Sequence, residues 1–295
     1  MKPLKVFYST RQNALSPPGG FSQSAGKPAL VVAAWRALGL PMEIVEPQPA
    51  TLADLCRAHD PAYVREVLAC RRANGFGSTC PDIAASLPWT TGSFLSAARH
   101  AAATGEPALS PTSGFHHAGW DSGGGFCTFN GLMVAALTLQ QESLVGRVAI
   151  LDLDRHFGDG TRDIIRRLRI DWIQHYTFGA EGIGRNGAGE WLADLPGIVE
   201  RTIRRCDVVF FQAGADPHID DPLGGVLTSE QLAIRDRTVF EVCRSRGVAV
   251  VVNLAGGYQR PIQKVVDLHS ETLTQLWQAH AREIPVAPAS VIVRT

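Results

Sequence analysis

Four ionisable side chains lie close together after an apolar run in the middle of the chain. The run 148–151 is followed by Asp152, Asp154, His156 and Asp159. If the strand continues, its period of two places Asp152, Asp154 and His156 on one face. One carboxylate and one imidazole in an Asp-x-His pair can hold a divalent cation. The other interpretation is a polar strand-to-helix loop, but buried carboxylates need partners, so four such groups favour a site.

A second acidic loop could complete this site. The buried strand predicted at 207–212 is followed by Gly214 and then by three acids, Asp216, Asp220 and Asp221. In a parallel sheet, the loops that leave the carboxyl ends of the strands share one edge and can converge. Any of the three acids could therefore join Asp154 and His156. The alternative interpretation is an Asp-rich turn.

Two adjacent histidines, His116 and His117, lie in a loop that begins near Gly114. Neighbouring residues of an extended segment point to opposite sides, but a bend at Gly114 could bring both imidazoles to one cavity. Otherwise one histidine is in the core and the other on the surface. A carboxylate bonded to a histidine fixes its tautomer and raises its basicity, and Asp152 and Asp159 are free to do so. Such pairs provide a general base and a general acid.

Tyr258 and Cys127 are two further side chains that could take part in chemistry. Tyr258 follows two glycines, which allow a turn that presents the phenol to a cavity. A phenol can donate a hydrogen bond to a developing oxyanion, although tyrosine is also a common loop anchor. Cys127 has no base at an obvious spacing, so we interpret it as buried packing.

Strands and helices alternate around these loops. Strands are predicted at 4–8, 42–45, 107–110, 148–151, 171–175, 207–212 and 248–254, and helices at 29–38, from 51, at 61–70, 91–103, 131–140, 161–168, 197–205, 228–246 and 261–280. Residues 73–90 and 178–189 are expected to be irregular. Several strands are continuous apolar runs, which indicates an α/β fold with a mostly parallel sheet covered on both faces. No linker or internal repeat is visible, so a single domain over 1–295 is expected.

Composition limits the possible partners. The chain has 295 residues, 45% of them hydrophobic, with 28 basic and 28 acidic side chains. Without a net field, neither nucleic acid nor an anionic membrane is an expected partner. The 6 cysteines form no Cys-x-x-Cys pair, so a thiolate cluster is not expected. No signal peptide or run of apolar residues long enough for a membrane helix is visible, which favours a cytoplasmic protein.

Taken together, these motifs resemble the zinc-dependent histone deacetylase superfamily, which also includes acetylpolyamine amidohydrolases. The matching segments, in the family's order, are 114–118, 125–130, 152–161, 214–216 with 221–222, 227–230, and 256–258. The resemblance covers nearly the whole chain. It implies the arginase–deacetylase α/β fold, with a central eight-stranded parallel sheet and helices on both faces.

The resemblance also assigns roles to individual residues. It implies that Asp154, His156 and Asp221 bind one Zn²⁺, with Asp221 preferred because the family's third ligand stands directly before a proline. It implies that the tandem His116 and His117 are catalytic and are backed by Asp152 and Asp159, respectively. Tyr258 is implied as the hydrogen-bond donor to the oxyanion. Gly125 and Phe126 are implied to line the substrate tunnel. Two oxygen ligands and one nitrogen ligand could also accommodate Fe²⁺ or Co²⁺. The resemblance leaves open whether a monovalent cation such as K⁺ binds near Asp152.

The function implied is hydrolysis of an acyl amide, such as acetyl-lysine or an acetylated polyamine, by a small bacterial-type enzyme. A homodimer is an expected partner state, because dimers are common in related amidohydrolases. The chain departs from the family at Phe157, where a second histidine is usual, and at Arg155, where an apolar residue is usual. The loop 178–189 lacks the expected aromatic tunnel wall, with Phe178 and Ile183 as substitutes. Two other functions remain open, a binuclear ureohydrolase of arginase type and a non-catalytic protein that binds acylated chains.

Overall fold

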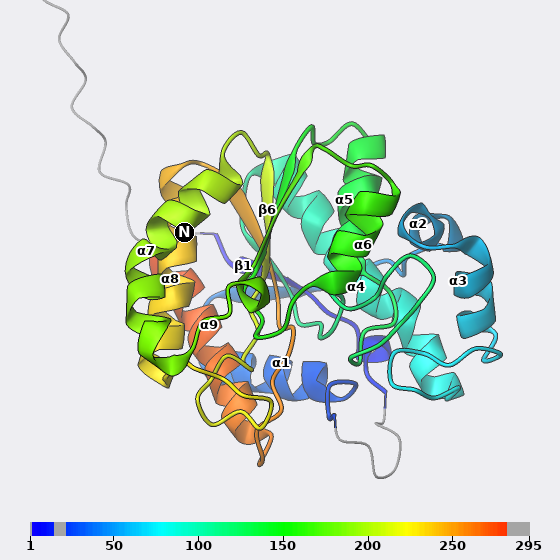
Figure 1. Ribbon diagram of the computed structural model, residues 1–295, viewed down its shortest axis with the longest axis horizontal. Helices are drawn as coiled ribbons and strands as arrows, with labels where there is room; N and C mark the ends of the chain where they lie inside the picture. The colour runs from blue at the N-terminus through cyan, green and yellow to red at the C-terminus, as the bar shows by residue number, and fades with distance from the viewer. Residues whose placement is uncertain (1, 15–21, 282–295) are drawn as a thin grey trace, which may run out of the picture.

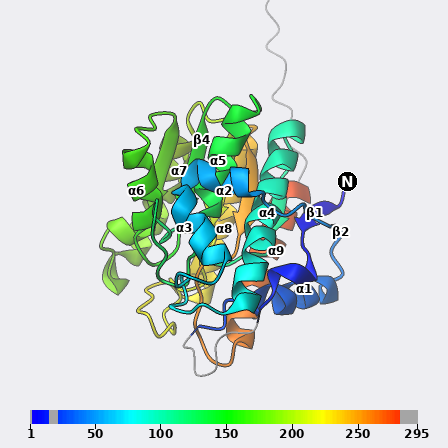
Figure 2. The same cartoon turned by 90° about the vertical axis from the view of Figure 1, so that its right-hand side faces the viewer.

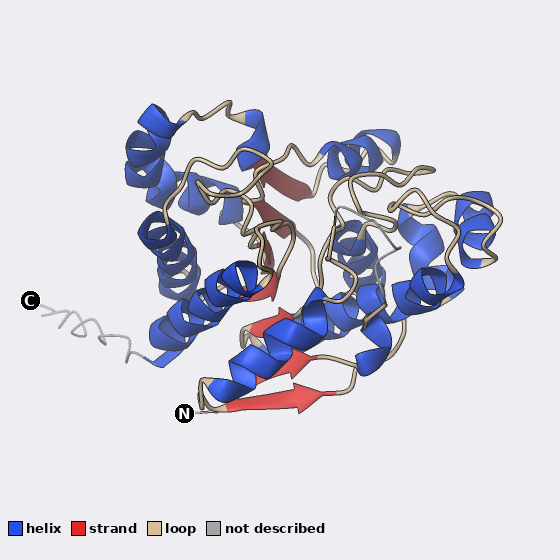
Figure 3. Cartoon of the chain, turned by 90° about the horizontal axis from the view of Figure 1, so that it is seen from below, coloured by secondary structure: helices blue, strands red, loops and turns tan. Residues whose placement is uncertain are grey.

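The computed structural model describes residues 2–14 and 22–281. A parallel sheet runs through them, with seven strands in the order β2-β1-β3-β7-β6-β4-β5. The strands are β1 (Leu4–Phe7), β2 (Met42–Val45), β3 (Ala108–Ser110), β4 (Val148–Asp152), β5 (Ile173–Thr177), β6 (Val208–Gln212) and β7 (Ala249–Asn253). Figure 3 shows the strands between helices that lie on both sides. The predicted fold class is confirmed.

The expected count of eight strands was wrong, because the described residues form seven. At one edge, β5 leads through two short 3₁₀ turns, Phe178–Ala180 and Arg185–Gly187, into a helix that returns the chain to β6. At the other edge, β2 is followed by helices. Neither edge therefore gains a further strand in the part of the chain that the structure describes.

Helices cover both faces of the sheet (Figures 1 and 2). They are α1 (Lys27–Ala37), α2 (Leu52–Ala58), α3 (Pro61–Leu68), α4 (Pro81–Thr104), α5 (Gly131–Gln141), α6 (Asp159–Arg167), α7 (Ala188–Ile203), α8 (Ser229–Ser245) and α9 (Gln263–Ala281). One apolar cluster joins α1, α7, α8 and α9 to the sheet through residues such as Val209 and Phe211. A second cluster joins α2, α3, α4, α5 and α6 to the other face of the sheet through residues such as Val208 and Phe210. Because both faces are buried, the strands read as continuous apolar runs.

Two helices extend further than the sequence suggested. The segment before residue 90 was expected to be irregular, but α4 begins at Pro81 and contains Pro88. Helix α7 likewise begins at Ala188 and continues through Pro196. A proline inside a helix removes one backbone hydrogen bond. Burial of an apolar face, such as that of Leu195 in α7, offsets this loss, so proline alone did not mark the helix boundary.

Five neighbouring strands each end in a polar residue at the carboxyl edge of the sheet. The last register pairs are Ser110 with Asn253, Asn253 with Gln212, Gln212 with Asp152, and Asp152 with Thr177. A row of polar side chains therefore lies along one edge of an otherwise apolar sheet, and the loops beyond it carry the predicted site. No helix among the described residues is long and apolar enough to cross a membrane.

Candidate metal and catalytic site

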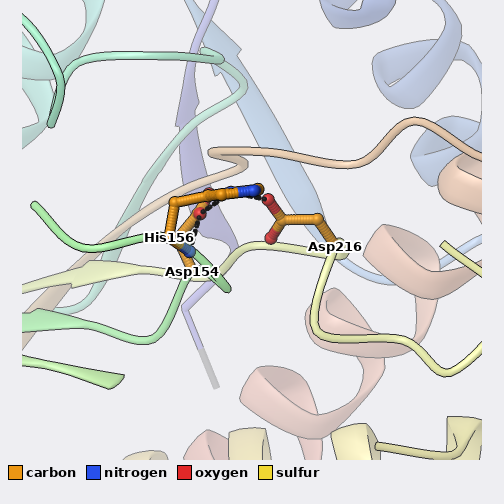
Figure 4. A group of neighbouring side chains, drawn as sticks. All are labelled: Asp154, His156 and Asp216. Atoms are coloured by element: carbon orange, nitrogen blue, oxygen red, sulfur yellow. Dashed lines mark hydrogen bonds and ion pairs between the residues drawn. The ribbon is translucent and has the colours of Figure 1, made fainter. Parts of the chain in front are cut away.

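Asp154, His156 and Asp216 converge at the carboxyl edge of the sheet (Figure 4). Asp154 and His156 follow β4, and Asp216 lies in the loop after β6. Their ligand atoms all lie within 4.8 Å of one another. The Nδ1 atom of His156 is 3.2 Å from an oxygen of Asp154 and 3.0 Å from an oxygen of Asp216. Two carboxylates and one imidazole thus face a common point.

The third residue of this cluster is Asp216, whereas the family resemblance implied Asp221. The two carboxylate oxygens of Asp221 accept hydrogen bonds from the backbone N–H groups of Leu223 and Tyr258, at 3.0 and 2.8 Å. Asp216 instead lies close to β4, because the loop turns inward directly after the sheet. A Cβ atom at Gly256 would lie 2.2 Å from an oxygen of Asp216, so only glycine allows this approach. The geometry therefore favours Asp216 over Asp221 as the acid that faces Asp154 and His156.

The donor set fits a divalent cation. Asp154 and Asp216 are 2% and 0% exposed, so both carboxylates are removed from water. Burial and the neighbouring Asp154 carboxylate raise the pKa of Asp216 to about 7. Burial also acts to raise the pKa of Asp154, but the nearby His116 and His156 hold it well below its usual range. Two buried acids with an imidazole beside them supply oxygen and nitrogen donors that divalent transition metals can accept.

The two histidines form the expected pairs with aspartates. The Nδ1 atom of His116 lies 2.8 Å from an oxygen of Asp152, and that of His117 lies 2.6 Å from an oxygen of Asp159. The loop bends sharply before them, with φ of 88° at Gly114. As a result the two imidazole rings lie side by side, with centroids 4.0 Å apart. The structure thus brings this predicted set together, and its catalytic role stays a prediction.

The surroundings shift the pKa values of the two imidazoles in opposite directions. Burial of His116 opposes its protonation, but the carboxylates of Asp152 and Asp154 outweigh it and raise the pKa to about 9. For His117, burial and the positive charge of His116 lower the pKa, despite the hydrogen bond with Asp159. One imidazole therefore favours the charged form and the other the neutral form.

A hydrogen-bond network that the sequence analysis missed holds Asp152. The side-chain amide of Gln212 donates to Asp152 at 3.0 Å, and that of Asn253 donates to Gln212 at 3.3 Å. The backbone N–H of Asp154 also donates to Asp152, at 3.3 Å. Each of these side chains ends an apolar strand, and this position was the signal that could have identified them.

Tyr258 and Phe126 lie next to each other. Their rings are 5.6 Å apart, and Phe126 also lies 5.7 Å from Phe76, a neighbour that the sequence did not reveal. A Cβ atom at Gly125 would lie 2.5 Å from the ring of His117, so a larger residue would displace that imidazole. Burial and the nearby carboxylates raise the pKa of the Tyr258 phenol well above its usual range. The phenol therefore remains a hydrogen-bond donor.

The loop 178–189 places its aromatic residue in the core. Phe178 is 0% exposed and lies 4.5 Å from the ring of Trp191, so it does not form a tunnel wall. Ile183 is half-buried, and its carbonyl accepts a hydrogen bond of 3.3 Å from Arg155. Arg155 also donates to the carbonyl of Gly224 at 2.8 Å. This residue, which departs from the family pattern, ties two loops to the metal-ligand segment.

Lys27 is a buried cation near the site that the sequence gave no reason to select. Its Nζ atom donates to the carbonyl of Ala255 at 2.7 Å. Burial lowers the pKa of Lys27 to about 8, against the opposing effect of Asp216 and Asp154. Ala255 has φ of 50° and directly precedes the two glycines before Tyr258. The ammonium group thus supports the loop that carries the tyrosine.

Comparison with known proteins places the chain in a family. The family model described as histone deacetylase domain matches residues 23–171. An uncharacterised protein of Picosynechococcus sp. is 31% identical over 78% of this chain and 83% of its own. A probable deacetylase of Methanothermobacter thermautotrophicus is 27% identical over 72% of this chain and 74% of its own. Histone deacetylase 2 of Arabidopsis thaliana is 27% identical, but the match spans only 48% of that protein.

A solved structure supports the fold independently. The crystal structure of the HDA15 HD domain matches with a TM-score of 0.73 at 18% identity, covering 94% of this chain and 87% of that one. At this level of identity the match shows the fold alone. The family model and the deacetylase relatives support a hydrolase of the deacetylase class, and they favour neither an arginase-type ureohydrolase nor a binding protein. The chain therefore belongs to the histone deacetylase family.

Proposed function

We propose that the protein is a metal-dependent amidohydrolase that removes an acyl group, such as acetyl, from an amine such as acetyl-lysine or an acetylpolyamine. The observation that carries this proposal is one convergence at the carboxyl edge of the sheet. The cluster of Asp154, His156 and Asp216 lies beside the two histidine–aspartate pairs. His116 Nε2 is 3.7 Å from an oxygen of Asp154, and the ring centroids of His117 and His156 are 5.9 Å apart. A metal site and groups that move protons are the two requirements for hydrolysis of an unreactive amide.

Asp154, His156 and Asp216 would hold one Zn²⁺, and Fe²⁺ or Co²⁺ suits the same donors. When bound, the metal would polarise the acyl carbonyl and lower the pKa of a water molecule. Asp221 has a different part in this proposal. By accepting the backbone N–H of Tyr258 at 2.8 Å, it holds the start of the tyrosine segment near the cluster.

His117 is the residue that we assign to proton transfer. Its side chain is 22% exposed, whereas that of His116 is 4% exposed, so His117 faces the side from which substrate and solvent arrive. In its neutral form it accepts a proton from the attacking water and then donates it to the leaving amine. His116 stays bonded to Asp152 and contributes positive charge beside the reacting carbonyl.

Tyr258 and Phe126 are the residues that we assign to binding the carbonyl oxygen and the acyl-bearing chain of the substrate. The protonated phenol donates a hydrogen bond to the oxygen that becomes negative when the carbonyl is attacked. The rings of Phe126 and Phe76 form an apolar wall beside Tyr258, along which the acyl-bearing chain lies. An apolar wall of this kind accepts the methylene groups of a lysine or polyamine side chain without any charged contact.

A panel of acyl amines tests the proposal. Acetyl-lysine peptides, acetylpolyamines and longer acyl-lysines are incubated with Zn²⁺-loaded protein, and with the variants Asp154→Ala and Asp216→Ala. Asp82→Ala is the matched control, since Asp82 is exposed in α4. We expect turnover of one substrate class in the wild type and the control, and loss of turnover and bound metal in both site variants. Metal-loaded wild-type protein that hydrolyses no member of the panel would contradict the proposal.

A further inference from the structure

Arg235 is a buried arginine that the proposed reaction does not use. It lies in α8 on the face of the sheet covered by α1, α7 and α9, and it is only 2% exposed. A charged side chain in the interior is costly unless every part of it is bonded. The contacts of the guanidinium group therefore indicate what the charge is there to hold.

Two of these contacts reach the segments that carry the metal-site acids. The Nη1 atom of Arg235 donates to the carbonyl of Leu153 at 3.1 Å and to that of Gly214 at 2.7 Å. Leu153 directly precedes Asp154, and Gly214 lies two residues before Asp216. One nitrogen with two hydrogens thus joins the two backbone segments.

The position of these carbonyls explains why such a donor is useful. The pairing of β4 with β6 ends at Asp152 and Gln212, and a last backbone bond joins Leu153 N–H to the carbonyl of Gln212 at 3.1 Å. Beyond this point the backbone segments that follow β4 and β6 enter separate loops. Arg235 joins the two segments immediately after their last backbone hydrogen bond. Its Nη1 atom thus connects them where the backbone no longer does.

The guanidinium is itself held by a fixed set of neighbours. Its Nε atom donates to Asp236 at 2.7 Å, and Thr272 of α9 donates to the other oxygen of Asp236 at 2.7 Å. The group also lies over the ring of Phe211, with Cζ 5.7 Å from the centroid. Asp236, which is itself bonded to α9, and the ring of Phe211 in β6 leave little freedom for the Nη1 atom to move.

We infer that Arg235 is a positioning residue for the metal site, which sets the separation of Asp154 and Asp216 by holding the carbonyls of Leu153 and Gly214. This inference rests on the proposed function. A lysine at this position would keep a positive charge next to Asp236. Its single nitrogen, however, cannot occupy the positions of both Nε and Nη1, so it cannot pair with Asp236 and also bridge the two carbonyls as the arginine does.

The test is the binding of Co²⁺ to the metal-free protein, measured by competition with a chelator and by the visible absorption of the bound ion. Arg235→Lys is compared with Arg237→Lys, which makes the same change at an exposed position of the same helix. Loss of a group that orients metal ligands weakens metal binding roughly 10- to 100-fold. We expect a decrease of this size and a changed Co²⁺ spectrum in Arg235→Lys, and neither effect in Arg237→Lys.

A second variant covers the case in which Arg235→Lys does not fold. Arg235→Met combined with Asp236→Asn removes both buried charges together, which a protein core often tolerates. It also removes the donor to both carbonyls. The fold of each metal-free variant is checked by circular dichroism and thermal unfolding, and the double variant is expected to show the same weakened Co²⁺ binding.

The outcomes separate this inference from the proposed function. If the wild type binds no Co²⁺ or Zn²⁺, the proposed function fails and the inference falls with it. If the wild type binds the metal and a folded Arg235 variant binds it with equal affinity and an identical spectrum, only the inference is overturned. In that case Arg235 would contribute to the stability of the core and not to the geometry of the site.

Discussion

The two histidine–aspartate pairs have the same connectivity but very different surroundings. In the His116–Asp152 pair the side chains are 4% and 0% exposed, whereas in the His117–Asp159 pair they are 22% and 63% exposed. The buried aspartate is held by three donors, and the side chain of the exposed one is largely open to solvent. A pair that cannot reach solvent fixes a charge in place, while a pair at the surface can exchange its proton. The difference indicates that neighbouring histidines have separate tasks.

Removal of the exposed imidazole should have the largest effect. His117→Gln deletes the group that moves protons in the proposed reaction, so we expect kcat to fall by roughly 10²- to 10⁴-fold. The KM and the bound metal should change little, because His117 is not among the three metal-site residues. Steady-state kinetics with the substrate found in the panel, and metal analysis, check this. A loss below tenfold would show that the accessible pair does not carry the proton.

Neutralisation of the buried Asp152 should have the second-largest effect on kcat. The Asp152 carboxylate accepts hydrogen bonds from the side-chain amide of Gln212 and from the backbone N–H of Asp154. Asp152→Asn places an amide N–H against one of these donors, so we expect kcat to fall by about 100-fold. The buried mismatch should also cost about 1–3 kcal/mol of stability. Kinetics and chemical denaturation measure the two effects, and an unchanged stability would contradict the assigned network.

The same substitution in the exposed pair should have the smallest effect. In Asp159→Asn the side-chain oxygen can still accept from His117, and exposed ion pairs contribute little, so we expect less than a tenfold loss in kcat. The Asp159 carboxylate favours protonated His117. Without it the pKa of His117 falls further, and the acid limb of the pH–rate profile should move to lower pH. Equal losses in Asp152→Asn and Asp159→Asn would remove the distinction between the pairs.

The sequence predicted the order of the elements and most of the residues that the structure brings together. Apolar runs identified the strands because both faces of the sheet are buried. The adjacent His116 and His117 could be paired with Asp152 and Asp159 from the resemblance, and the structure shows these contacts. Helix boundaries were less predictable, because Pro88 and Pro196 lie within helices that packing stabilises.

The choice among the acids of one loop could not be made from the sequence. Asp216 and Asp221 lie five positions apart, and only the path of the loop decides which carboxylate faces Asp154. The contacts of Lys27 and Arg235 were equally hidden, because each reaches a backbone carbonyl of a distant segment. Every residue has a backbone carbonyl, so no pattern of side chains in the sequence predicts which carbonyl accepts such a hydrogen bond.

The neighbouring positions of β4 and β6 in the sheet have a consequence for local unfolding. These strands are adjacent in space, yet α6, β5 and α7 lie between them in sequence. A cation shared by Asp154 and Asp216 would therefore act as a cross-link that closes the chain from Arg155 to Ala215 into a loop. Closing a loop restricts the open states of the segment within it. Hydrogen exchange in β5 and α7 should then slow on metal binding, although neither element contributes a ligand.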